Sequence, residues 1–596
     1  MRFGRVALWL LLGLAAPTVP VIGSGGQASS EAPGPELARI IADYERFDRE
    51  EDPFTSGQEG DQAALARLPG VTPADAARRK AALEQFRTRL TGVAAQTLGA
   101  DERLNLTFLR RVVEDRLERL RFDEGRLGFT NEGGPDQFLG YMGASTVIRS
   151  ATDADAYLSR LEAAPKYIED STANMRRGVS TGFVQSRTTT EVVLRQMKAQ
   201  LGKPIADDAG LMKPLAALPA TIPADAQTAY RDRARALIQT KIRAAQQAFA
   251  RVVETEVLPV AKPAVGALHL PGGREYYTYL ARSYTTTELT PDQIHEIGLA
   301  EVGRIRAGMQ TEMRAADFSG TFPEFLRFLR TDVRFYAASR EDLMEKSARI
   351  AKRADDALPK IVATLPRLPY GVREVPRDIE ENYTTARYNP GSPQLGLAGG
   401  LMVNTSHLDQ RPLYEHPALI LHEGVPGHHL QIAIQQELGE QPWFRRQAEV
   451  TAFTEGWGLY SEYLGYDIGA YHDPYERFGK LSMEMWRACR LVADTGMHWK
   501  GWTIEQARAC FADNSALAPR NIENELQRYI SWPGQALAYK IGELKLRALR
   551  KRAETELGVR FDLRRFHDVV LRGGPLPLDL LEQRVNDWIV SEKRKA

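Results

Sequence analysis

The chain has 596 residues, several times the length of a typical domain, which allows a deep hydrophobic core. Its 78 lysines and arginines balance its 77 aspartates and glutamates, so the charge offers no electrostatic attraction to nucleic acid or to an anionic membrane. The apolar fraction of 43% is ordinary for a soluble globular protein.

Residues 1–30 are typical of a secretory signal followed by a disordered tail. Arg2 and Arg5 precede an apolar run over residues 6–16, and Pro, Gly and Ser follow to about Ser30. The run is too short to span a bilayer comfortably, and no later stretch is long and apolar enough to do so. Because no cysteine follows the run, we expect no lipid-modified N-terminus. We predict an exported protein, periplasmic or extracellular, without a membrane span after signal removal; an uncleaved anchor is the alternative.

Helical periodicity dominates the rest of the chain. One apolar stripe recurs at steps of three and four residues and comprises Leu106, Leu109, Val113, Leu117 and Leu120. Thr290 is expected to cap a helix that begins at Pro291, with Gln293 as its capping-box partner. Further helices are expected over residues 35–48, 73–95, 153–178, 224–256, 322–365, 480–498 and 534–556. Strand signals are few, so a mainly α fold is predicted.

One strand is predicted, over residues 401–406. It is partly β-branched, follows a Gly/Pro-rich stretch and precedes a His-rich segment. A lone strand or small sheet edge beside a catalytic helix can pair with an extended substrate backbone, and Asn404 is a candidate substrate contact there. A loop with buried Leu and Val is the alternative.

Stretches rich in Pro, Gly and Ala near residues 203–224 and 366–400 are candidate domain joints. We divide the chain after the signal into an N-terminal helical part over residues 31–265 and a catalytic helical part over residues 266–596. One continuous domain from 31 to 596 is equally compatible with the sequence.

Histidine is scarce and clustered. The chain has ten histidines. Seven of them fall in one region of the catalytic part, namely His407, His416, His422, His428, His429, His472 and His498. Scattered solvent-facing histidines would not usually concentrate in this way, so the cluster predicts a metal or acid–base site.

The centre of this cluster is the run over residues 422–429. His422 and Glu423 begin it in the manner of the zinc-peptidase pattern His-Glu-x-x-His. In that pattern a second histidine lies one helical turn after the first. Here that position is Pro426, which cannot bind a metal, so the simple pattern is absent.

Pro426 and Gly427 are expected to break or bulge the helix. Two residues absorbed in the break would bring His428 to the position of the second ligand, and three would bring His429 there instead. We favour His428, because Gly-His also ends the common His-Glu-x-Gly-His form, and we keep His429 as the alternative.

The third ligand should be a carboxylate from a following helix, and Glu455 is our candidate. Glu462, seven positions later on the same helical face, could orient a ligand histidine. The alternative is that Glu455 is a solvent-exposed residue of a helix and binds no metal. The pattern therefore predicts one zinc ion bound by His422, His428 and Glu455.

Four motifs together resemble a bacterial family catalogued as domain of unknown function 885. They occupy residues 422–429, 455–457, 487–498 and 532–540. The resemblance extends from about residue 35 to 590. That family looks like a distant relative of gluzincin peptidases such as Taq carboxypeptidase, thimet oligopeptidase and angiotensin-converting enzyme. The resemblance implies a large helical fold around a deep central channel, with zinc bound by His, His and Glu.

The remaining roles follow from the chemistry of peptide hydrolysis. Glu423 is placed by the motif to take a proton from a zinc-activated water. His498 and Tyr539 are candidate donors to the oxyanion, with Tyr529 in reserve. The alternative to an oxyanion role is structural: His498 could stabilise the end of a helix, and the tyrosines could be packed in the core.

Arg487 and Arg490 lie three positions apart on one predicted helix and could hold the C-terminal carboxylate of a substrate. The alternative is that these arginines form ion pairs with Asp494 or Glu484 and do not contact a substrate. The two cysteines, Cys489 and Cys510, could form a disulfide in an oxidising compartment, but the sequence leaves their pairing open.

These features predict an exported zinc metallopeptidase that hydrolyses short peptides as a carboxypeptidase, dipeptidase or oligopeptidase. The alternatives are a non-catalytic peptide-binding protein on the same fold and a zinc hydrolase of another amide or ester. We expect no nucleic-acid partner, and the sequence leaves the oligomeric state open.

Overall fold

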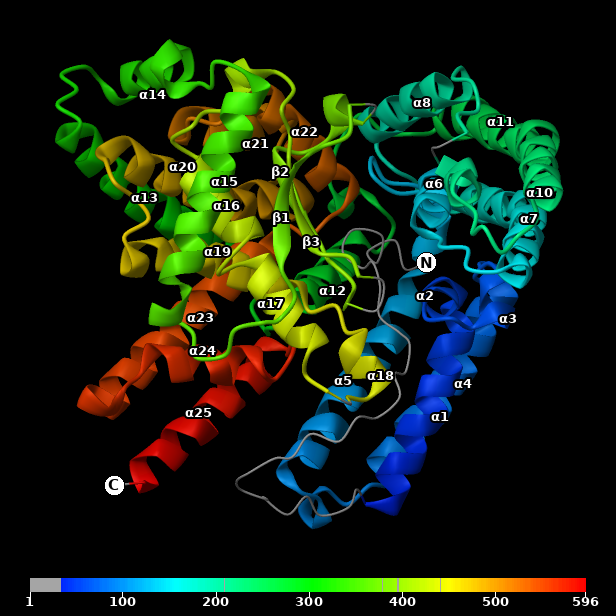
Figure 1. The fold of residues 1–596 in the computed structure, drawn as a ribbon, viewed down its shortest axis with the longest axis horizontal. Helices are drawn as coiled ribbons and strands as arrows, with labels where there is room; N and C mark the ends of the chain where they lie inside the picture. The colour runs from blue at the N-terminus through cyan, green and yellow to red at the C-terminus, as the bar shows by residue number, and fades with distance from the viewer. Residues whose placement is uncertain (1–33, 208–209, 378, 394–395, 440, 596) are drawn as a thin grey trace. The chain divides into compact units, whose positions relative to one another are not determined.

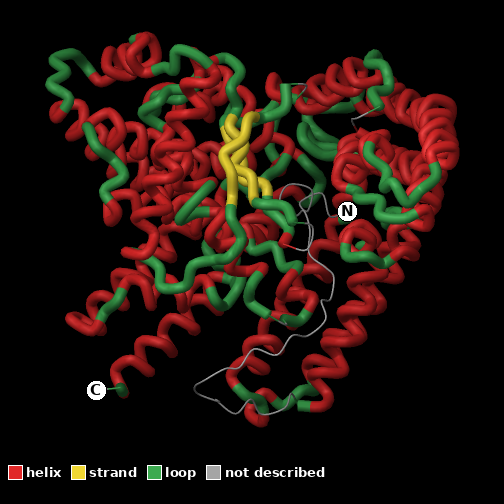
Figure 2. The backbone as a smooth tube through the Cα atoms, viewed as in Figure 1, coloured by secondary structure: helices red, strands yellow, loops and turns green. Residues whose placement is uncertain are grey.

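The computed structural model describes residues 34–207, 210–377, 379–393, 396–439 and 441–595. The predicted signal segment lies outside these residues. Helices account for most of the described chain, and three short strands form the sheet found within it (Figures 1 and 2). The predicted mainly α fold is confirmed. None of the helices in the described ranges is both long and apolar enough to cross a membrane.

The chain separates into two compact units. Unit 1 comprises the chain up to Lys262 together with Pro442–Gln447, and unit 2 comprises Pro263–Gln441 and the chain from Ala448 onward. The sequence analysis divides the chain between residues 265 and 266 and assigns residues 442–447 to the catalytic half.

Unit 1 is helical. Its helices are α1 (Pro35–Glu51), α2 (Pro53–Gln58), α3 (Gln62–Leu65), α4 (Pro73–Thr91), α5 (Ala100–Phe122), α6 (Pro135–Ser145), α7 (Ala151–Thr181), α8 (Arg187–Leu201), α9 (Lys213–Ala216), α10 (Ala224–Leu237), α11 (Arg243–Val252) and α18 (Trp443–Arg446). The indole N–H of Trp443 donates to Asp48 at 2.9 Å, and the Arg49 guanidinium lies 3.7 Å from the ring centroid. These contacts explain why α18 belongs with the N-terminal helices.

Unit 2 contains the sheet and the remaining helices. The helices are α12 (Gly273–Thr285), α13 (Pro291–Ala315), α14 (Phe322–Thr331), α15 (Arg340–Ala357), α16 (His416–Glu423), α17 (His428–Gln436), α19 (Thr451–Ile468), α20 (Pro474–Thr495), α21 (Ile504–Asn514), α22 (Pro519–Ser531), α23 (Leu537–Leu557), α24 (Leu563–Leu571) and α25 (Leu578–Arg594). The capping box predicted at Thr290 is present at the start of α13.

The single helix expected over residues 322–365 is instead two helices. The first, α14, ends at Thr331, and the second, α15, begins at Arg340. Ser339 caps α15 by accepting a hydrogen bond from the Asp342 N–H at 3.1 Å. A serine in this position competes with the helical backbone and starts a new helix, which periodicity alone does not reveal.

The sheet has the strand order β1-β3-β2. Its strands are β1 (Tyr370–Glu374), β2 (Ala386–Asn389) and β3 (Gly399–Val403). β1 pairs with β3 in parallel, and β2 pairs with β3 in antiparallel orientation. The strand predicted at residues 401–406 is confirmed only over 401–403, because β3 spans residues 399–403, and the prediction that it forms an edge is wrong. Two short strands in the irregular stretch before it pair with both of its sides, which leaves β2 as an edge.

Helices α19 and α23 cross at two glycines that bring their backbones into contact. A Cβ atom on Gly542 would lie 1.9 Å from the Ala452 carbonyl oxygen, and one on Gly456 would lie 2.6 Å from the Gly542 Cα. No side chain fits at either position without moving a helix. The crossing therefore fixes the position of α19, which carries Glu455.

A buried group of charges joins α13, α20 and α23. The Lys540 ammonium lies 2.9 Å from Glu301, 2.7 Å from Glu484 and 2.8 Å from Glu543. Burial disfavours a charged lysine, but the three carboxylates outweigh it and raise the pKa of Lys540. Removing one of these partners would leave a charge uncompensated in the core.

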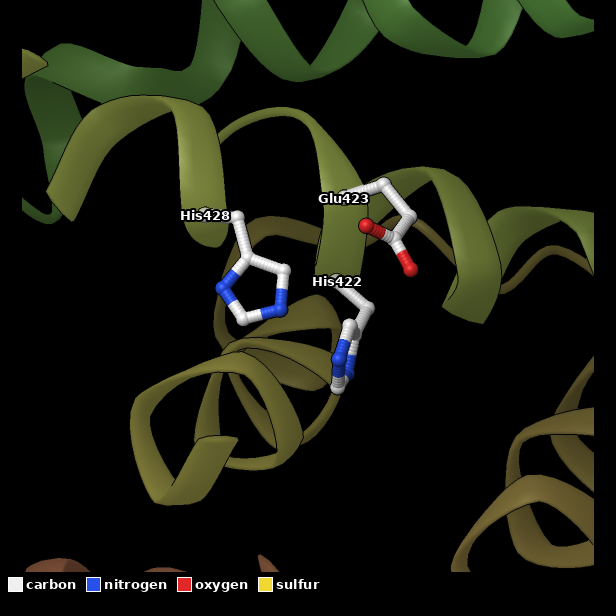
Figure 3. A group of neighbouring side chains, drawn as sticks. All are labelled: His422, Glu423 and His428. Atoms are coloured by element: carbon white, nitrogen blue, oxygen red, sulfur yellow. The ribbon is translucent and has the colours of Figure 1, made fainter. Parts of the chain in front are cut away.

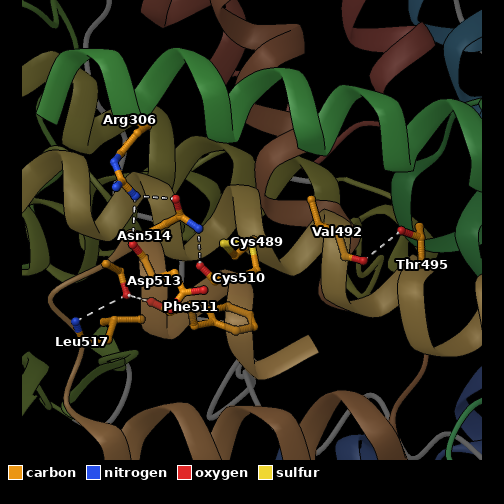
Figure 4. The surroundings of a disulfide bond; sticks show 10 residues. Arg306, Cys489, Val492, Thr495, Cys510, Phe511, Asp513, Asn514 and Leu517 are labelled. Carbon is orange, nitrogen blue, oxygen red and sulfur yellow. Dashed lines mark hydrogen bonds between the residues drawn. A yellow bond between two sulfur atoms is a disulfide. The ribbon is translucent and has the colours of Figure 1, made fainter. Parts of the chain in front are cut away.

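Cys489 and Cys510 form a disulfide between α20 and α21 (Figure 4). Near it, the Arg306 guanidinium of α13 donates to the Asp513 carbonyl and to the Asn514 side chain, both at 2.8 Å. The pairing that the sequence left open is thus present, and α21 is attached to two neighbouring helices.

The helix crossing can be tested with glycine variants. Gly542→Ala should destabilise the protein by about 1–3 kcal/mol, because the added methyl group must push α23 away from α19. Gly303→Ala in α13 is the matched control, since a Cβ there meets no atom within 4 Å and alanine favours a helix by up to about 1 kcal/mol. Chemical unfolding of both variants gives the comparison, and equal stabilities would contradict the crossing.

Candidate metal centre

The helix that carries His422 is interrupted directly after Glu423. Helix α16 ends at Glu423 and α17 begins at His428, and the Val425–Pro426 peptide bond between them is cis. A Cβ on Gly427 would lie 2.0 Å from the carbonyl oxygen of His422, so only glycine fits at that point. The Trp457 indole of α19 donates to the Pro426 carbonyl at 2.8 Å and holds the break in place.

The break brings His422 and His428 face to edge. Their ring centroids are 4.7 Å apart with an interplanar angle of 89°, and Figure 3 shows both rings turned to the same side of the helix. Both side chains are buried. Two imidazoles from consecutive helical segments therefore converge on one point.

Glu455 of α19 completes this group. Its Oε2 lies 3.5 Å from His422 Nε2 and 3.4 Å from His428 Nε2. Two ligands of a tetrahedral zinc ion lie about 3.3 Å apart when each bond is about 2.0–2.1 Å long. Burial would raise the pKa of Glu455, but the two histidines outweigh it and hold the pKa well below its usual value. The three residues thus have the chemistry and spacing of a zinc ligand set.

Glu423 lies beside the same group. Ligand atoms of His422, Glu423 and His428 all lie within 4.8 Å of one another, so Glu423 is also within reach of a cation (Figure 3). One of its oxygens accepts the backbone N–H of Tyr388 in β2 at 2.8 Å. Of the two carboxylates, Glu455 fits the position of a third ligand better, because one of its oxygens lies within 3.5 Å of both histidines, whereas Glu423 is bonded to the backbone of β2.

The far side of His422 is held by a second carboxylate. His422 Nδ1 lies 2.9 Å from Glu462 Oε1, and Arg487 lies 3.1 Å from the same oxygen. A Cβ on Gly458 would lie 2.7 Å from His422 Cε1, so the imidazole fits only against a glycine. This arrangement presents Nε2 to the ligand point, as outer carboxylates do for metal-binding histidines.

His429 points elsewhere. Burial lowers its pKa to about 4 despite a hydrogen bond to the Leu368 backbone, so the ring is neutral at pH 7. The Tyr388 hydroxyl donates to its Nδ1 at 2.9 Å, and the Tyr370 ring centroid is 4.4 Å away. Both tyrosines belong to the sheet, so His429 fastens α17 to β1 and β2.

The predicted oxyanion donor His498 is occupied by backbone groups. The Ala267 N–H donates to Nδ1 at 2.8 Å, and Nε2 lies 2.9 Å from the Tyr529 carbonyl. Burial lowers the pKa of His498 to about 4 despite that second hydrogen bond. The neutral ring therefore uses both of its nitrogens to join segments of unit 2.

The two arginines of α20 and the two candidate tyrosines lie in a connected cluster. Arg490 donates to the Tyr529 hydroxyl and to Glu525, both at 2.7 Å, and its guanidinium lies 4.2 Å from the Tyr539 ring centroid. Arg528 donates to the Tyr539 hydroxyl at 3.2 Å. Arg490 and Arg487 thus pair with Glu525 and Glu462 rather than with Asp494 or Glu484. Their predicted role in holding a substrate carboxylate stays a prediction.

Asn404 lies in the interior beside the sheet. Its amide donates to three carbonyl oxygens, those of Glu380 at 2.8 Å, Tyr383 at 3.1 Å and Thr384 at 3.3 Å. Its carbonyl accepts the Ser406 N–H at 3.0 Å. These bonds shape the loop that leads into β2, and they use both the nitrogen and the oxygen of the Asn404 side-chain amide.

Several residues that position the candidate ligands have no signal in the sequence. Tyr388 reaches Glu423 through its N–H and His429 through its hydroxyl, and Gly458 gives room to His422. Tyr383 is a further neighbour: burial raises its pKa, Glu423 adds to the rise and Arg387 opposes it. None of these contacts follows from local spacing, because they join separate elements of the chain.

The charge state of His422 gives a pH-dependent prediction for protein stripped of metal. Burial opposes protonation, but hydrogen bonds with Glu455 and Glu462 outweigh it and raise the pKa of His422 to about 9. The unfolded pKa is about 6.5, so this group contributes roughly 3 kcal/mol below pH 6.5 and loses it as the pH rises through about 9. Glu462→Gln should weaken this loss, which unfolding measurements across that range would detect. An unchanged pH slope in the variant would contradict the assignment.

Two solved structures have the same overall fold as this chain. No protein with a curated description matches the chain. A candidate lipoprotein from Colwellia psychrerythraea has a TM-score of 0.86 and 26% identity, covering 93% of this chain and 99% of that one. A candidate lipoprotein of unknown function from Shewanella oneidensis has a TM-score of 0.70 and 18% identity, covering 92% and 99%. The model of a bacterial family of unknown function matches residues 53–585, and the chain therefore belongs to this family, DUF885.

Proposed function

We propose that the protein is a zinc metallopeptidase that hydrolyses short peptides. The observation that carries this proposal is that Glu455 Oε2 lies 3.5 Å from His422 Nε2 and 3.4 Å from His428 Nε2, with the carboxylate of Glu423 beside the two histidines. Two imidazoles and one carboxylate form a donor set that suits zinc and leaves a fourth position for a reactant.

A zinc ion in this position would polarise a substrate carbonyl and lower the pKa of an attacking water. Glu423 is suited to accept the proton of that water and to deliver it to the leaving amine. The backbone N–H of Tyr388 keeps this carboxylate beside the ligands, at 2.8 Å from its Oε2. A general base in a fixed position is what this reaction needs from the chain.

A peptide substrate is favoured by the outer edge of β2. The carbonyl of Thr385, just before β2, accepts the Asn404 N–H at 3.0 Å. In an antiparallel pair this means that the backbone N–H and C=O groups at odd-numbered positions of β2 point toward β3. The alternate groups, at Ala386 and Tyr388, then face outward, where none of the strands in the described chain pairs with β2. The Tyr388 N–H on this edge bonds Glu423. Because that N–H is taken, an extended peptide would pair through the N–H and C=O of Ala386 and the C=O of Tyr388, which brings it past the proposed general base.

Tyr539 is the better of the two predicted oxyanion donors. Its hydroxyl accepts a hydrogen bond from Arg528, which leaves its own proton to donate, whereas both nitrogens of His498 bond to the backbone. Tyr539 lies one helical turn before Gly542, the residue of α23 that touches α19 next to Glu455. This position supports a donor directed to the reacting carbonyl.

Export from the cytoplasm is part of the proposal. Two structures with the same fold are described as candidate lipoproteins, a class found outside the cytoplasm. The disulfide between Cys489 and Cys510 fits an oxidising compartment, where such bonds persist. The proposed location is the periplasm or the extracellular space.

Metal binding can be tested with adjacent histidines. His428→Ala should abolish stoichiometric zinc, because it removes one ligand, whereas His429→Ala should keep zinc, because this ring bonds Tyr388. Metal analysis of purified protein and titration after chelation would measure both. Loss of zinc in the His429 variant alone would assign the second ligand to that residue and overturn the assignment of His428.

Catalysis can be tested by mass spectrometry on a peptide library. Glu423→Gln should retain zinc and lower kcat by at least 100-fold, the lower range for removal of a general base. Tyr539→Phe, assayed in parallel, should lower kcat by about 100–1000-fold with little change in zinc content. Normal turnover by the Glu423 variant would exclude the mechanism. Binding without cleavage by the wild type would favour a peptide receptor, and cleavage of esters alone would favour another hydrolase.

A further inference from the structure

Arg387 lies within the edge strand β2, on the face opposite to the buried side chains of Ala386 and Tyr388. Ala386 and Tyr388 pair with Val403 and Leu401 and are buried with them. Side chains alternate along a strand, so Arg387 lies on the opposite face, level with Met402 of β3. Its side chain is half-buried.

The guanidinium of Arg387 has no carboxylate partner among the described residues. Its recorded neighbour is the Tyr383 ring, at 5.7 Å from the ring centroid. The acids that precede β2 are already engaged: Glu380 receives two hydrogen bonds of 2.7 Å from Arg340, and Glu381 accepts from His407 at 2.9 Å. Arg487 and Arg490 differ in this respect, since each pairs with a glutamate.

The strand that carries Arg387 also bonds the proposed general base through its backbone. The residue that follows it, Tyr388, donates its N–H to Glu423 at 2.8 Å. Tyr383 is in electrostatic range of both Arg387 and Glu423, since both affect its pKa. A group bound by Arg387 would therefore lie beside the reacting part of a substrate on this edge.

We propose that Arg387 selects substrates that carry a carboxylate on the residue lying opposite it along the outer edge of β2. The inference rests on the proposed peptidase function. The N–H and C=O of Arg387 face β3, so the opposite residue of an added antiparallel strand would form a non-hydrogen-bonded pair with it. In such pairs the Cβ atoms are about 4.5–5.5 Å apart on the same face, within reach of a guanidinium–carboxylate contact.

Two sources of the carboxylate are distinguishable with one peptide panel. A parent peptide is synthesised with Glu, Gln or Lys at each successive position, and each version is made with a free C-terminus and with a C-terminal amide. The wild type should cleave the Glu version about 10-fold faster than the Gln version, as kcat/KM, at one position. If an acidic side chain is recognised, the amide retains this preference; if the terminal carboxylate is recognised, the free acid replaces Glu as the preferred form.

Two arginine variants complete the experiment. Arg387→Gln should abolish the preference, and Arg387→Glu should reverse it toward Lys, with zinc content unchanged in both. Arg373→Gln is the matched control: Arg373 lies on β1, level with Met402, two strands away from Arg387. It removes the same charge from the sheet and should leave the preference intact.

Failure of this inference is separable from failure of the proposed function. Peptide cleavage without any carboxylate preference, or a preference that survives in Arg387→Gln, would overturn the role of Arg387 and leave the peptidase assignment standing. If no peptide is cleaved, the peptidase assignment fails. Calorimetric binding of the Glu and Gln peptides then decides the inference, and equal affinities for the wild type would overturn it.

Discussion

The chain between Glu423 and His428 passes through four residues that are not helical, and contacts on both sides fix their path. The position of Gly427 against the carbonyl of His422 leaves no space for a side chain, and the Trp457 indole holds the Pro426 carbonyl. Because of this path, the last turn of α16 and the first turn of α17 present their histidines to one point. Trp457 lies two residues after Glu455, so one helix supplies both the support of the break and the carboxylate that contacts the two histidines.

The charges around this point explain why it suits a cation. Glu455 and Glu462 lie on either side of His422, and Glu423 lies beside it, whereas Arg487 is the basic side chain paired with this group. Buried carboxylates need a positive partner, and protonation of His422 provides one when a metal is absent. A divalent ion would meet the same need through its bonds to the ligands. A bound metal ion and a proton on His422 would therefore each compensate the charge of the same buried carboxylates.

The edge strand β2 connects the metal ligands with the region where a substrate would lie. Tyr388 orients Glu423 with its backbone and His429 with its hydroxyl, so one residue attaches the interrupted helix to the sheet. Arg387, the residue before it, projects from the other face of the same strand. The proposed base and the proposed substrate contact thus both depend on the position of β2.

The sequence by itself determined the helical class, the capped start of α13 and the family, and it predicted His422, Glu455 and one of two histidines as candidate ligands, because helical periodicity and ligand spacing are local patterns. It left His428 and His429 as alternatives, since the number of residues absorbed in the break depends on Gly427 and Trp457. It also predicted β3 as an edge strand, although β3 is the central strand. It predicted that Arg490 and His498 contact the substrate, although both bond to groups of the chain itself. Only the tertiary structure gave the strand order, the backbone hydrogen bonds of His498 and the convergence of His428, rather than His429, with His422 and Glu455, because each depends on contacts between segments that are distant in the chain.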